Sequence, residues 1–484
     1  MSRADFNVRT LQHIAGTFAG IDALERVVIV APRADFDRPY AFRCEVPAAG
    51  HPLRAEGLEL LFARAATIAV AIVGTSKLRI HCEDDSTLVF LQRKLSENSA
   101  LISNMQQFGP VLIDRGGPED VDIDLCHLPF RSRSSASQEP HSEPLEEQLF
   151  VGIDYGRSDI KTVVVDASDR LLAKYVTRWW RIDDSGVLEY VDPQVLTSHK
   201  CHVQCLAEAA IAALQQVKDF SKKTVCGVGI SAAGCVKYGK LCGIPPAMGG
   251  VEDTDATRQD LENLEGCVLE EMRKILDVKA RCTSVLVNDG DASALYGASG
   301  MPAGKAGLFL SCGTGLAGGV VWKGDSCDGI LELGKLVVGL PDTGTGGVVP
   351  VHDGLNLPAA AQGMCGTQRA FFNLLAARGG DFITGKAEQR AALVAMQKKE
   401  LDADSRGLFE SLGQWLACFV MELNEYLPVK VNYVEAGGKV TDGPTGEAML
   451  EACRQALPEM EVRKALDSEF GQAVAVASLV RPQG

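Results

Sequence analysis

The spacing of apolar residues along the chain changes between short continuous runs and helical periodicity, as in α/β proteins. The runs 26–31 and 285–287 are short and apolar and predict buried strands, whereas 56–73 has helical spacing and predicts a helix. Segment 131–147 interrupts this pattern with Ser, Pro, Gln and charged residues and a single large apolar residue. Such a segment buries too little surface to offset its ordering entropy, so we predict a flexible linker between two globular regions.

The first region, residues 1–130, is predicted to be a separate α/β domain. Strands are expected at 78–82 and 111–114, and a helix at 90–108. The pattern contains no clear helix-turn-helix, and positive and negative charges are mixed, so we do not expect this domain to bind DNA. Its role is left open by the sequence.

The second region repeats one pattern. Residues 149–177 and residues 307–323 each predict strand, tight turn and strand, and each opens a block of alternating helices and strands. Two such blocks predict two lobes, 148–300 and 301–484, with a ligand cleft between them.

Composition narrows the class of protein. The net charge of −15 over 484 residues opposes a general nucleic-acid binder, which needs a basic face. No secretory signal opens the chain, and the most apolar early run, 65–74, is shorter than the ~20 residues that span a bilayer. The 15 cysteines are scattered, and several lie in strand-like runs, which favours reduced thiols in a cytoplasmic protein.

The first candidate motif is the turn that carries Asp154, Gly156 and Ser158, between two apolar strands. A carboxylate at a strand end can hold Mg²⁺ partly through water, so Asp154 is the predicted metal ligand. Gly156 and Ser158 can donate N–H and hydroxyl hydrogen bonds to a phosphate. An ordinary polar hairpin explains this short motif equally well.

The second motif is Asn288-Asp289, between an apolar strand and a helix rich in small residues. A helix N-terminus favours an ionised carboxylate, so Asp289 can accept the proton of a hydroxyl that attacks a phosphate. The alternative is a helix cap without catalytic function.

Two further motifs are rich in glycine, and each follows a strand. Consecutive N–H groups of the first can surround an anion, and the paired glycines of the second offer a flat surface for an adenine. A plain hairpin and a plain strand-to-helix turn are the respective alternatives. The residues are Gly313, Thr314, Gly315, Gly318 and Gly319 in the first motif and Gly437 and Gly438 in the second.

The order of these four motifs resembles that of the ROK family of sugar kinases and sugar-sensing repressors, over about residues 149–455. The resemblance implies a two-lobed actin-like (ribonuclease H-like) sugar kinase fold, with Mg-ATP bound between the lobes and Asp289 as the catalytic base. It implies the two phosphate motifs at 154–158 and 313–319 and an adenosine motif at 437–438. It also implies sugar contacts from Asn288, Glu332, Lys335 and Asn356.

The sequence departs from the family pattern around the sugar site. Lys335 stands where the family has a His that binds zinc or sugar, and residues 337–352 contain no cysteine, whereas the family has a cysteine-rich zinc loop there. We therefore expect no structural zinc and an altered sugar pocket. Arg157-Ser158 also replaces the usual Gly-Thr pair.

The predicted function is ATP-dependent phosphorylation of a hexose or amino-sugar hydroxyl. Two alternatives stay open: a non-catalytic sensor or scaffold of the same fold, and an ATPase that couples hydrolysis to a conformational change. The expected partner is a small-molecule sugar, without nucleic acid or membrane, and a homodimer is left open. The sequence does not specify the sugar.

Overall fold

The structure is a computed structural model, and contacts between Cα atoms divide it into two compact units. Unit 1 comprises residues 1–130, 303–323 and 327–464, and unit 2 comprises residues 131–302, 324–326 and 465–484. The residues described are 8–34, 36–117, 124–131, 144–156, 159–182, 188–190, 197–237, 239–276, 282–327, 332–342, 351–352, 357–379, 386–398, 402–465 and 469–481.

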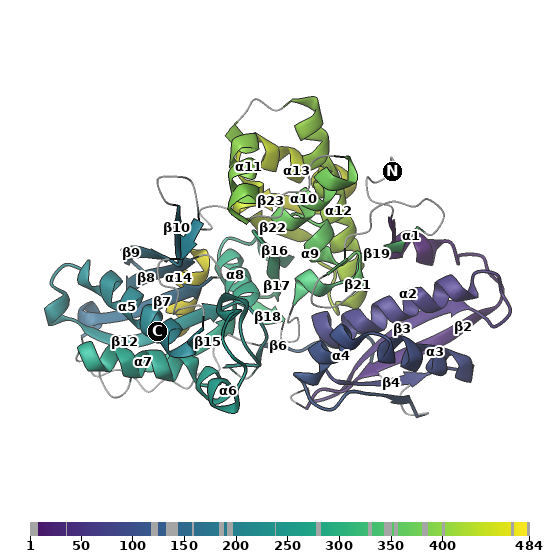
Figure 1. The fold of residues 1–484 in the computed structure, drawn as a ribbon, viewed down its shortest axis with the longest axis horizontal. Helices are drawn as coiled ribbons and strands as arrows, with labels where there is room; N and C mark the ends of the chain where they lie inside the picture. The colour runs from purple at the N-terminus through teal and green to yellow at the C-terminus, as the bar shows by residue number, and fades with distance from the viewer. Residues whose placement is uncertain are drawn as a thin grey trace. The chain divides into compact units, whose positions relative to one another are not determined.

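Figure 1 labels the elements of both units. The first region contributes to unit 1 β1 (Val8–Thr10), α1 (Leu11–Gly16), β2 (Leu24–Ala31), β3 (Tyr40–Pro47), α2 (Arg54–Thr67), the π-helix η1 (Ile68–Ile72), β4 (Lys77–His81), α3 (Asp85–Ser96), α4 (Ser99–Gln106), β5 (Leu112–Arg115) and β6 (Phe130–Arg131). Later residues add β16 (Ala306–Cys312), β17 (Leu316–Trp322), β18 (Asp325–Cys327, of which only Cys327 is assigned to unit 1), η8 (Leu333–Lys335), β19 (Gly339–Pro341), β20 (Val351–His352), β21 (Leu357–Pro358), α9 (Ala361–Met364), α10 (Gln368–Ala377), α11 (Lys386–Lys398), α12 (Ala403–Tyr426), β22 (Tyr433–Gly437), η9 (Lys439–Thr441), α13 (Gly443–Ala456) and β23 (Glu461–Lys464).

Unit 2 has fewer elements. They are η4 (Leu145–Glu147), β7 (Gln148–Tyr155), β8 (Asp159–Asp166), β9 (Leu171–Arg178), β10 (Trp180–Ile182), β11 (Leu188–Tyr190), α5 (His199–Gln215), η6 (Phe220–Lys222), β12 (Thr224–Ala232), β13 (Val236–Lys237), β14 (Lys240–Leu241), η7 (Pro246–Met248), α6 (Asp255–Leu261), α7 (Leu264–Ile275), β15 (Thr283–Asn288), α8 (Asp289–Ala298) and α14 (Gly471–Leu479).

The N-terminal part of unit 1 is a four-stranded sheet of order β3-β2-β4-β5, on which α2 packs (Figure 1). β2 confirms the strand predicted at 26–31: Val27 and Ile29 face the large core, whereas Val28 and Val30 face a small cluster with Ala41. The helix predicted at 90–108 is two helices, because the Asn98 side chain accepts from the Leu101 N–H and caps the start of α4.

The second sheet of unit 1 has the order β23-β22-β16-β17-β18-β6, with β16 and β17 antiparallel and β22 parallel to β16. The long helix α12 packs against α13, α10 and α9 beside it (Figure 1). These elements are mixed α/β, as predicted.

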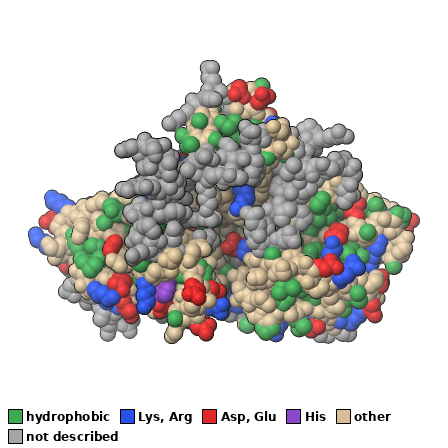
Figure 2. Space-filling model, in the orientation of Figure 1, with side chains coloured by type: hydrophobic (Ala, Val, Ile, Leu, Met, Phe, Trp, Pro, Cys, Tyr) green, Lys and Arg blue, Asp and Glu red, His purple; other side chains and the backbone are tan. Residues whose placement is uncertain are grey.

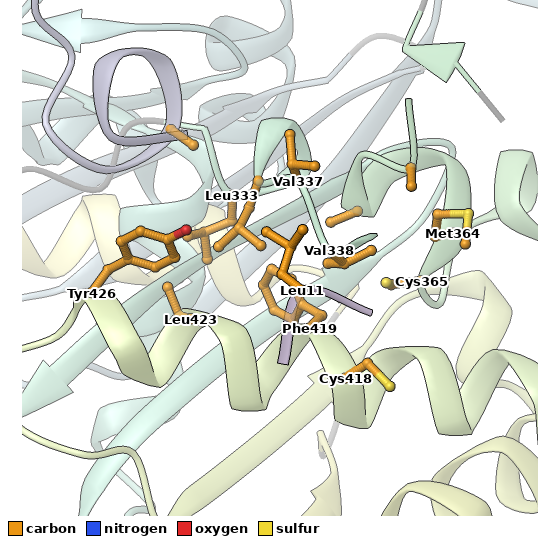
Figure 3. Packing of buried hydrophobic residues seen from close by; sticks show 14 of the residues in the cluster. Leu11, Leu333, Val337, Val338, Met364, Cys365, Cys418, Phe419, Leu423 and Tyr426 are labelled. Atoms are coloured by element: carbon orange, nitrogen blue, oxygen red, sulfur yellow. The ribbon is translucent and has the colours of Figure 1, made fainter. Parts of the chain in front are cut away.

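A separate N-terminal domain is not what the structure shows, because residues 1–130 share unit 1 with 327–464. β1 pairs antiparallel with β19, from Val8 opposite Pro341 to Thr10 opposite Gly339. One continuous apolar core contains side chains of both parts: Figure 3 shows Leu11 among Leu333, Val337, Val338 and Phe419. The expected domain boundaries themselves stay predictions, and residues 132–143 of the expected linker lie outside the described part of the chain.

A buried ion pair lies in the same core. The Arg64 Nε of α2 donates to the Glu422 carboxylate of α12 at 3.2 Å. The Arg64 side chain is 8% exposed and the Glu422 side chain is 1% exposed. Gln12 Nε2 and the Tyr426 hydroxyl donate to the same carboxylate, each at 2.8 Å. Each buried charge thus has partners from a distant part of the sequence, as such burial requires.

Unit 2 is a five-stranded mixed sheet of order β15-β12-β7-β8-β9. Side chains of β7 alternate between its faces, so Val151 packs with α5 and α7, whereas Phe150 packs with α14. α14 lies directly on the strands: a Cβ at Gly152 would lie 1.8 Å from the Ala473 oxygen. The last helix therefore belongs to unit 2, although the sequence assigned 301–484 to the second lobe.

Among the helices in the described part of the chain, none combines the length and apolarity needed to cross a membrane.

Candidate functional site

The candidate site in unit 2 lies at the carboxyl ends of three parallel strands. Register places Asp154 of β7 opposite Ser231 of β12, and Ala232 opposite Asn288 of β15. Because neighbouring strands are ~4.8 Å apart, these three strand ends fall within about 10 Å of one another. Open α/β sheets bind ligands at this edge.

Asp154 is a buried carboxylate, 7% exposed, with three polar neighbours. Lys161 Nζ lies 3.4 Å from Asp154 Oδ2 and 2.8 Å from Asp159 Oδ1, and Ser231 Oγ lies 3.4 Å from Asp154 Oδ1. Burial raises the pKa of the Asp154 carboxyl, and Lys161 opposes that effect. Burial lowers the pKa of Lys161, but Asp154 and Asp159 together raise it above its ordinary value, so the ammonium stays charged.

The turn after Asp154 closes through the backbone. Gly156 N–H donates to Asp159 O at 3.0 Å, and Trp179 Nε1 donates to Gly156 O at 2.9 Å. Arg157 and Ser158 lie outside the described residues, so the predicted phosphate contact of Ser158 has no structural description.

Asn288, and not Asp289, is the N-cap of α8. Its Oδ1 accepts from Gly290 N–H at 2.7 Å, and its Nδ2 donates to Gly234 O at 2.7 Å. Gly290 N–H also donates to Asp289 Oδ1, at 3.0 Å, so the two side chains share this donor. Asp289 lies in the first helical turn, half-buried, where the helix N-terminus stabilises negative charge.

The donors around Asp154 fit Mg²⁺ in chemistry. They are oxygens of Asp154, Asp159 and Ser231, and Mg²⁺ is bound through one or two carboxylates together with substrate phosphates. No group of three or more His, Cys, Asp or Glu side chains suited to a metal ion occurs among the described residues. Residues 343–350 and 353–356 are outside that set, and the absence of zinc stays a prediction.

In unit 1 the first glycine-rich motif is the turn of the β16–β17 hairpin. Gly313 N–H donates to Gly315 O at 3.1 Å, and Thr314 is exposed at the tip. Gly318 and Gly319 are not in the turn: they pair inside the sheet with Leu310 and Phe309 and are buried. Their predicted phosphate contact stays a prediction. Close packing gives Gly318 a structural reason to be glycine, because a Cβ there would lie 2.6 Å from Phe309 O.

The second glycine-rich motif lies beside the first. Parallel pairing of β16 and β22 sets Gly437 opposite Ser311. Gly438 has φ +96°, and a Cβ there would lie 2.6 Å from the Cys312 oxygen. This position therefore requires glycine, and unit 1 brings together the residues predicted to contact phosphate and adenosine.

The segment predicted to contact sugar adjoins the hairpin turn within unit 1. A Cβ at Gly334 would lie 2.9 Å from Leu316 O, and Lys335 Nζ donates to Asn104 Oδ1 of α4 at 3.0 Å. Glu332 is partly exposed at the start of η8. Asn356 lies outside the described residues.

Sequence reasoning missed two polar residues at these sites. Lys161 could have been found, because a turn after Asp154 sets these two residues opposite each other in the hairpin. Gln362 of α9 lies beside both the hairpin turn and the segment predicted to contact sugar: its side chain is 3.6 Å from a Cβ built on Gly315 and 3.4 Å from one built on Gly334. No local pattern around Gln362 signals this.

Figure 2 shows Lys and Arg side chains among Asp and Glu side chains on the face drawn. The expectations of no nucleic-acid and no membrane partner, and of a cytoplasmic location, stay predictions.

Structural neighbours of this chain are ROK family sugar kinases and a ROK regulator, in agreement with the resemblance inferred from the motifs. A ROK hexokinase from Thermus thermophilus is 22% identical to this chain, with a TM-score of 0.47. The alignment covers 69% of this chain and 97% of the hexokinase chain. A ROK family glucokinase from Streptomyces griseus, solved with glucose and AMPPNP, is 19% identical with a TM-score of 0.46, covering 68% and 98%.

A ROK family transcriptional regulator, a homolog of the E. coli MLC protein, is 14% identical with a TM-score of 0.45, covering 69% of this chain and 78% of its own. No protein-family model matches the sequence, and no curated protein is similar to it. Similarity at these identities and TM-scores assigns neither an activity nor site residues to this chain.

Proposed function

We propose that this chain transfers the γ-phosphoryl group of ATP to a hydroxyl of a hexose or amino sugar. The observation that carries the proposal is the place of Asp289. It directly follows the end of β15, which neighbours β12 with Ser231 and is two strands from β7 with Asp154, and its neighbour Asn288 supplies the helix cap. Asp289 Oδ1 also accepts from Gly290 N–H, at 3.0 Å. The proposal assigns its carboxylate as the base because the helix N-terminus favours the ionised form.

Asp289 accepts the proton of the attacking hydroxyl in this proposal, while Asn288, Glu332 and Lys335 orient the sugar. Asn356 is assigned to the sugar as well. The transition state of phosphoryl transfer is loose, so catalysis depends mainly on positioning and on stabilising negative charge. Lys161 supplies a fixed positive charge at the Asp154 strand end, in addition to the contacts predicted from the sequence.

The nucleotide contacts are assigned within each unit. In unit 1 the turn 313–315 binds phosphate and the step 437–438 binds adenosine, which the pairing of β16 with β22 supports. In unit 2 Gly156 and Ser158 bind phosphate. That ATP lies between two lobes stays an expectation from the sequence.

Asp154 and Asp159 would hold Mg²⁺, with Ser231 as a neighbouring oxygen donor. The ion would neutralise charge on the phosphate oxygens.

The test is Asp289→Asn, assayed by ADP release with a panel of hexoses and N-acetylhexosamines. Loss of a general base lowers the rate ~10²–10⁴-fold, while ATP affinity is expected to stay near that of the wild type. Asp291→Asn is the matched control, because Asp291 is also acidic and lies in the first turn of α8. Equal rates for the wild type and Asp289→Asn would refute the active-site assignment.

One observation favours a second function, that of a non-catalytic sensor. The Lys161 ammonium lies against Asp154, the predicted metal ligand, and an ammonium there competes with a metal ion for the carboxylate. A sensor would bind sugar or nucleotide without turnover. Sugar-dependent ADP release by the wild type decides between the two functions.

A further inference from the structure

The segment 332–341 carries Glu332 and Lys335 but has little backbone hydrogen bonding of its own. Within it, Lys335 N–H donates to Glu332 O at 3.0 Å, and Leu336 N–H donates to Leu333 O at 3.1 Å, which closes the turn η8. On one side, Val338 N–H donates to Ala359 O at 2.9 Å. On the other side, the hydrogen-bond partners of segment 332–341 lie in elements of residues 8–106.

The π-helix η1 supplies the first of those partners. η1 ends at Ile72, and beyond the left-handed Gly74 the Thr75 N–H donates back to Ala69 O at 2.8 Å. Ala71 O is among the last carbonyls of the helix, which have no donor within the helix itself. The Ala71 carbonyl accepts instead from Glu332 N–H, in a long bond of 3.5 Å. Single turns of π-helix occur frequently at functional sites.

Thr67 and α1 supply the next partners. The fully buried Thr67 Oγ1 accepts from Val337 N–H at 3.1 Å. Leu11 N–H donates to Val338 O at 3.0 Å. The neighbouring residues continue this contact as the pairing of β1 with β19. Figure 3 shows Leu11, Val337 and Val338 close together in the core. Buried backbone groups need such partners, so the path of the segment depends on the N-terminal elements.

Asn104 of α4 contacts the side chain of Lys335 and not the backbone of segment 332–341. Lys335 Nζ donates to its Oδ1 at 3.0 Å, while its Nδ2 donates to Ala100 O, one turn earlier in α4, at 3.0 Å. The second bond turns the amide so that its oxygen faces Lys335. One of the three ammonium donors is used in this way, and the flexible stem of the lysine is restrained.

We propose that residues 8–106 position the sugar-binding segment and thereby set the affinity for sugar, with Asn104 and Thr67 as the positioning residues. The inference rests on the proposed function, since it takes Glu332 and Lys335 as sugar contacts. Neither positioning residue touches the sugar. They act through Lys335 and through the backbone at Val337.

The first experiment measures steady-state kinetics of Asn104→Ala in the full chain. A hydrogen bond to a charged group is removed, so the KM for sugar is expected to rise about tenfold. The kcat and the KM for ATP are expected to stay within about twofold of the wild type, because only sugar binding is affected. Asn104→Asp keeps an acceptor oxygen and is expected to restore the sugar KM.

Gln92→Ala is the matched control. Gln92 Nε2 donates to Ile113 O at 2.9 Å, so this variant removes another amide hydrogen bond of the N-terminal region, away from segment 332–341. We expect unchanged kinetics. An equal rise of the sugar KM in Gln92→Ala and Asn104→Ala would show a general loss of structure and overturn the proposal, as would a lower sugar KM in Asn104→Ala.

The second experiment follows hydrogen exchange of segment 332–341. Thr67→Val removes the acceptor of Val337 N–H at nearly constant volume, and Thr67→Ser keeps it. Faster exchange at 332–341 in the valine variant, with protection kept in the serine variant, supports the proposal. Exchange that is equal in the wild type and Thr67→Val overturns it, whatever the enzymatic activity.

The proposed function and this inference fail in different ways. If the wild type binds a hexose or N-acetylhexosamine without phosphorylating it, the proposed kinase activity is wrong. Calorimetry then compares the sugar affinities of the wild type and Asn104→Ala, and that comparison decides the inference. A weaker affinity in the variant supports it and an equal affinity overturns it. If the wild type binds none of these sugars, both fail.

Discussion

Glu422→Ala tests whether the N-terminal region and α12 form one cooperative unit. The Glu422 carboxylate, 1% exposed, accepts from Arg64, Gln12 and the Tyr426 hydroxyl. The substitution leaves the Arg64 guanidinium buried without this carboxylate, and it also leaves an amide and a hydroxyl without their acceptor. Ionised Arg64 is favoured in the native protein, because Glu422 raises the pKa of the guanidinium although burial lowers it.

The magnitude follows from this geometry. Removing one partner of a buried ion pair typically costs about 3–5 kcal/mol, since an uncompensated charge stays in the core. Most domains have only ~5–15 kcal/mol of stability, so the loss is a large part of the total. Replacing both partners by Met, in Arg64→Met with Glu422→Met, leaves no buried charge and is expected to recover most of the loss.

The assay is urea denaturation of the full chain, followed by circular dichroism, with hydrogen exchange measured in parallel. Exchange separates the units, because unit 2 lacks this ion pair and is expected to keep its protection. Within unit 1, exchange should accelerate in residues 8–115 and in α12 alike. A change in stability below ~0.5 kcal/mol, or faster exchange confined to α12, would refute the shared unit.

Three further predictions concern packing. Gly438→Ala should destabilise the chain more than Gly304→Ala. Both glycines have positive φ, but only at Gly438 would an added Cβ lie 2.6 Å from an oxygen. Urea denaturation compares the two variants, and ATP titration should show weaker binding only for Gly438→Ala. Burial raises the pKa of the Cys312 thiol to about 12, so at pH 8 only ~10⁻⁴ of this thiol is ionised. Mass spectrometry should show iodoacetamide labelling of Cys312 only after unfolding. The partly exposed Cys201 should be labelled earlier. In the fragment 148–484 the residues of unit 1 should fail to fold, and hydrogen-exchange protection of α12 equal to that in the full chain would contradict a shared core.

The sequence predicted the elements whose signals are local. The short apolar run at 26–31 identified β2, and Asn288-Asp289 marked the start of α8. The break between α3 and α4 also has a local signal, the capping residue Asn98, but the apolar spacing continues across it and favoured one helix.

The place of the N-terminal region could not be predicted, because its contacts are distant in sequence. Arg64 and Glu422 are 358 positions apart, and each resembles an ordinary solvated charge in its own helix. β1 has three residues, too few to produce a pattern. A Ser- and Pro-rich linker normally separates domains, and that prior favoured a separate N-terminal domain, whereas residues 1–130 share unit 1 with residues 303–323 and 327–464.

The candidate site shows the same division between local and distant signals. The glycine turn 313–315 and the step 437–438 were visible as motifs, and parallel pairing of their strands brings them together. Gln362 was not visible, because it comes beside Gly315 and Gly334 through tertiary packing of α9. Motifs therefore predicted a ligand for each turn, whereas the neighbours of each turn required the structure.

The N-terminal region is joined to the rest of unit 1 by interactions of two kinds, with different consequences. Apolar contacts are tolerant of small shifts, but the hydrogen bonds at Thr67 and Asn104 specify atoms, because a buried N–H without an acceptor costs free energy. These directional bonds reach segment 332–341, whereas the hairpin turn 313–315 is set by pairing of its own strands. A change in α2 or α4 therefore acts directly on segment 332–341, through the hydrogen bonds of Thr67 and Asn104. Sugar affinity and nucleotide affinity should accordingly respond separately to substitutions in residues 8–106.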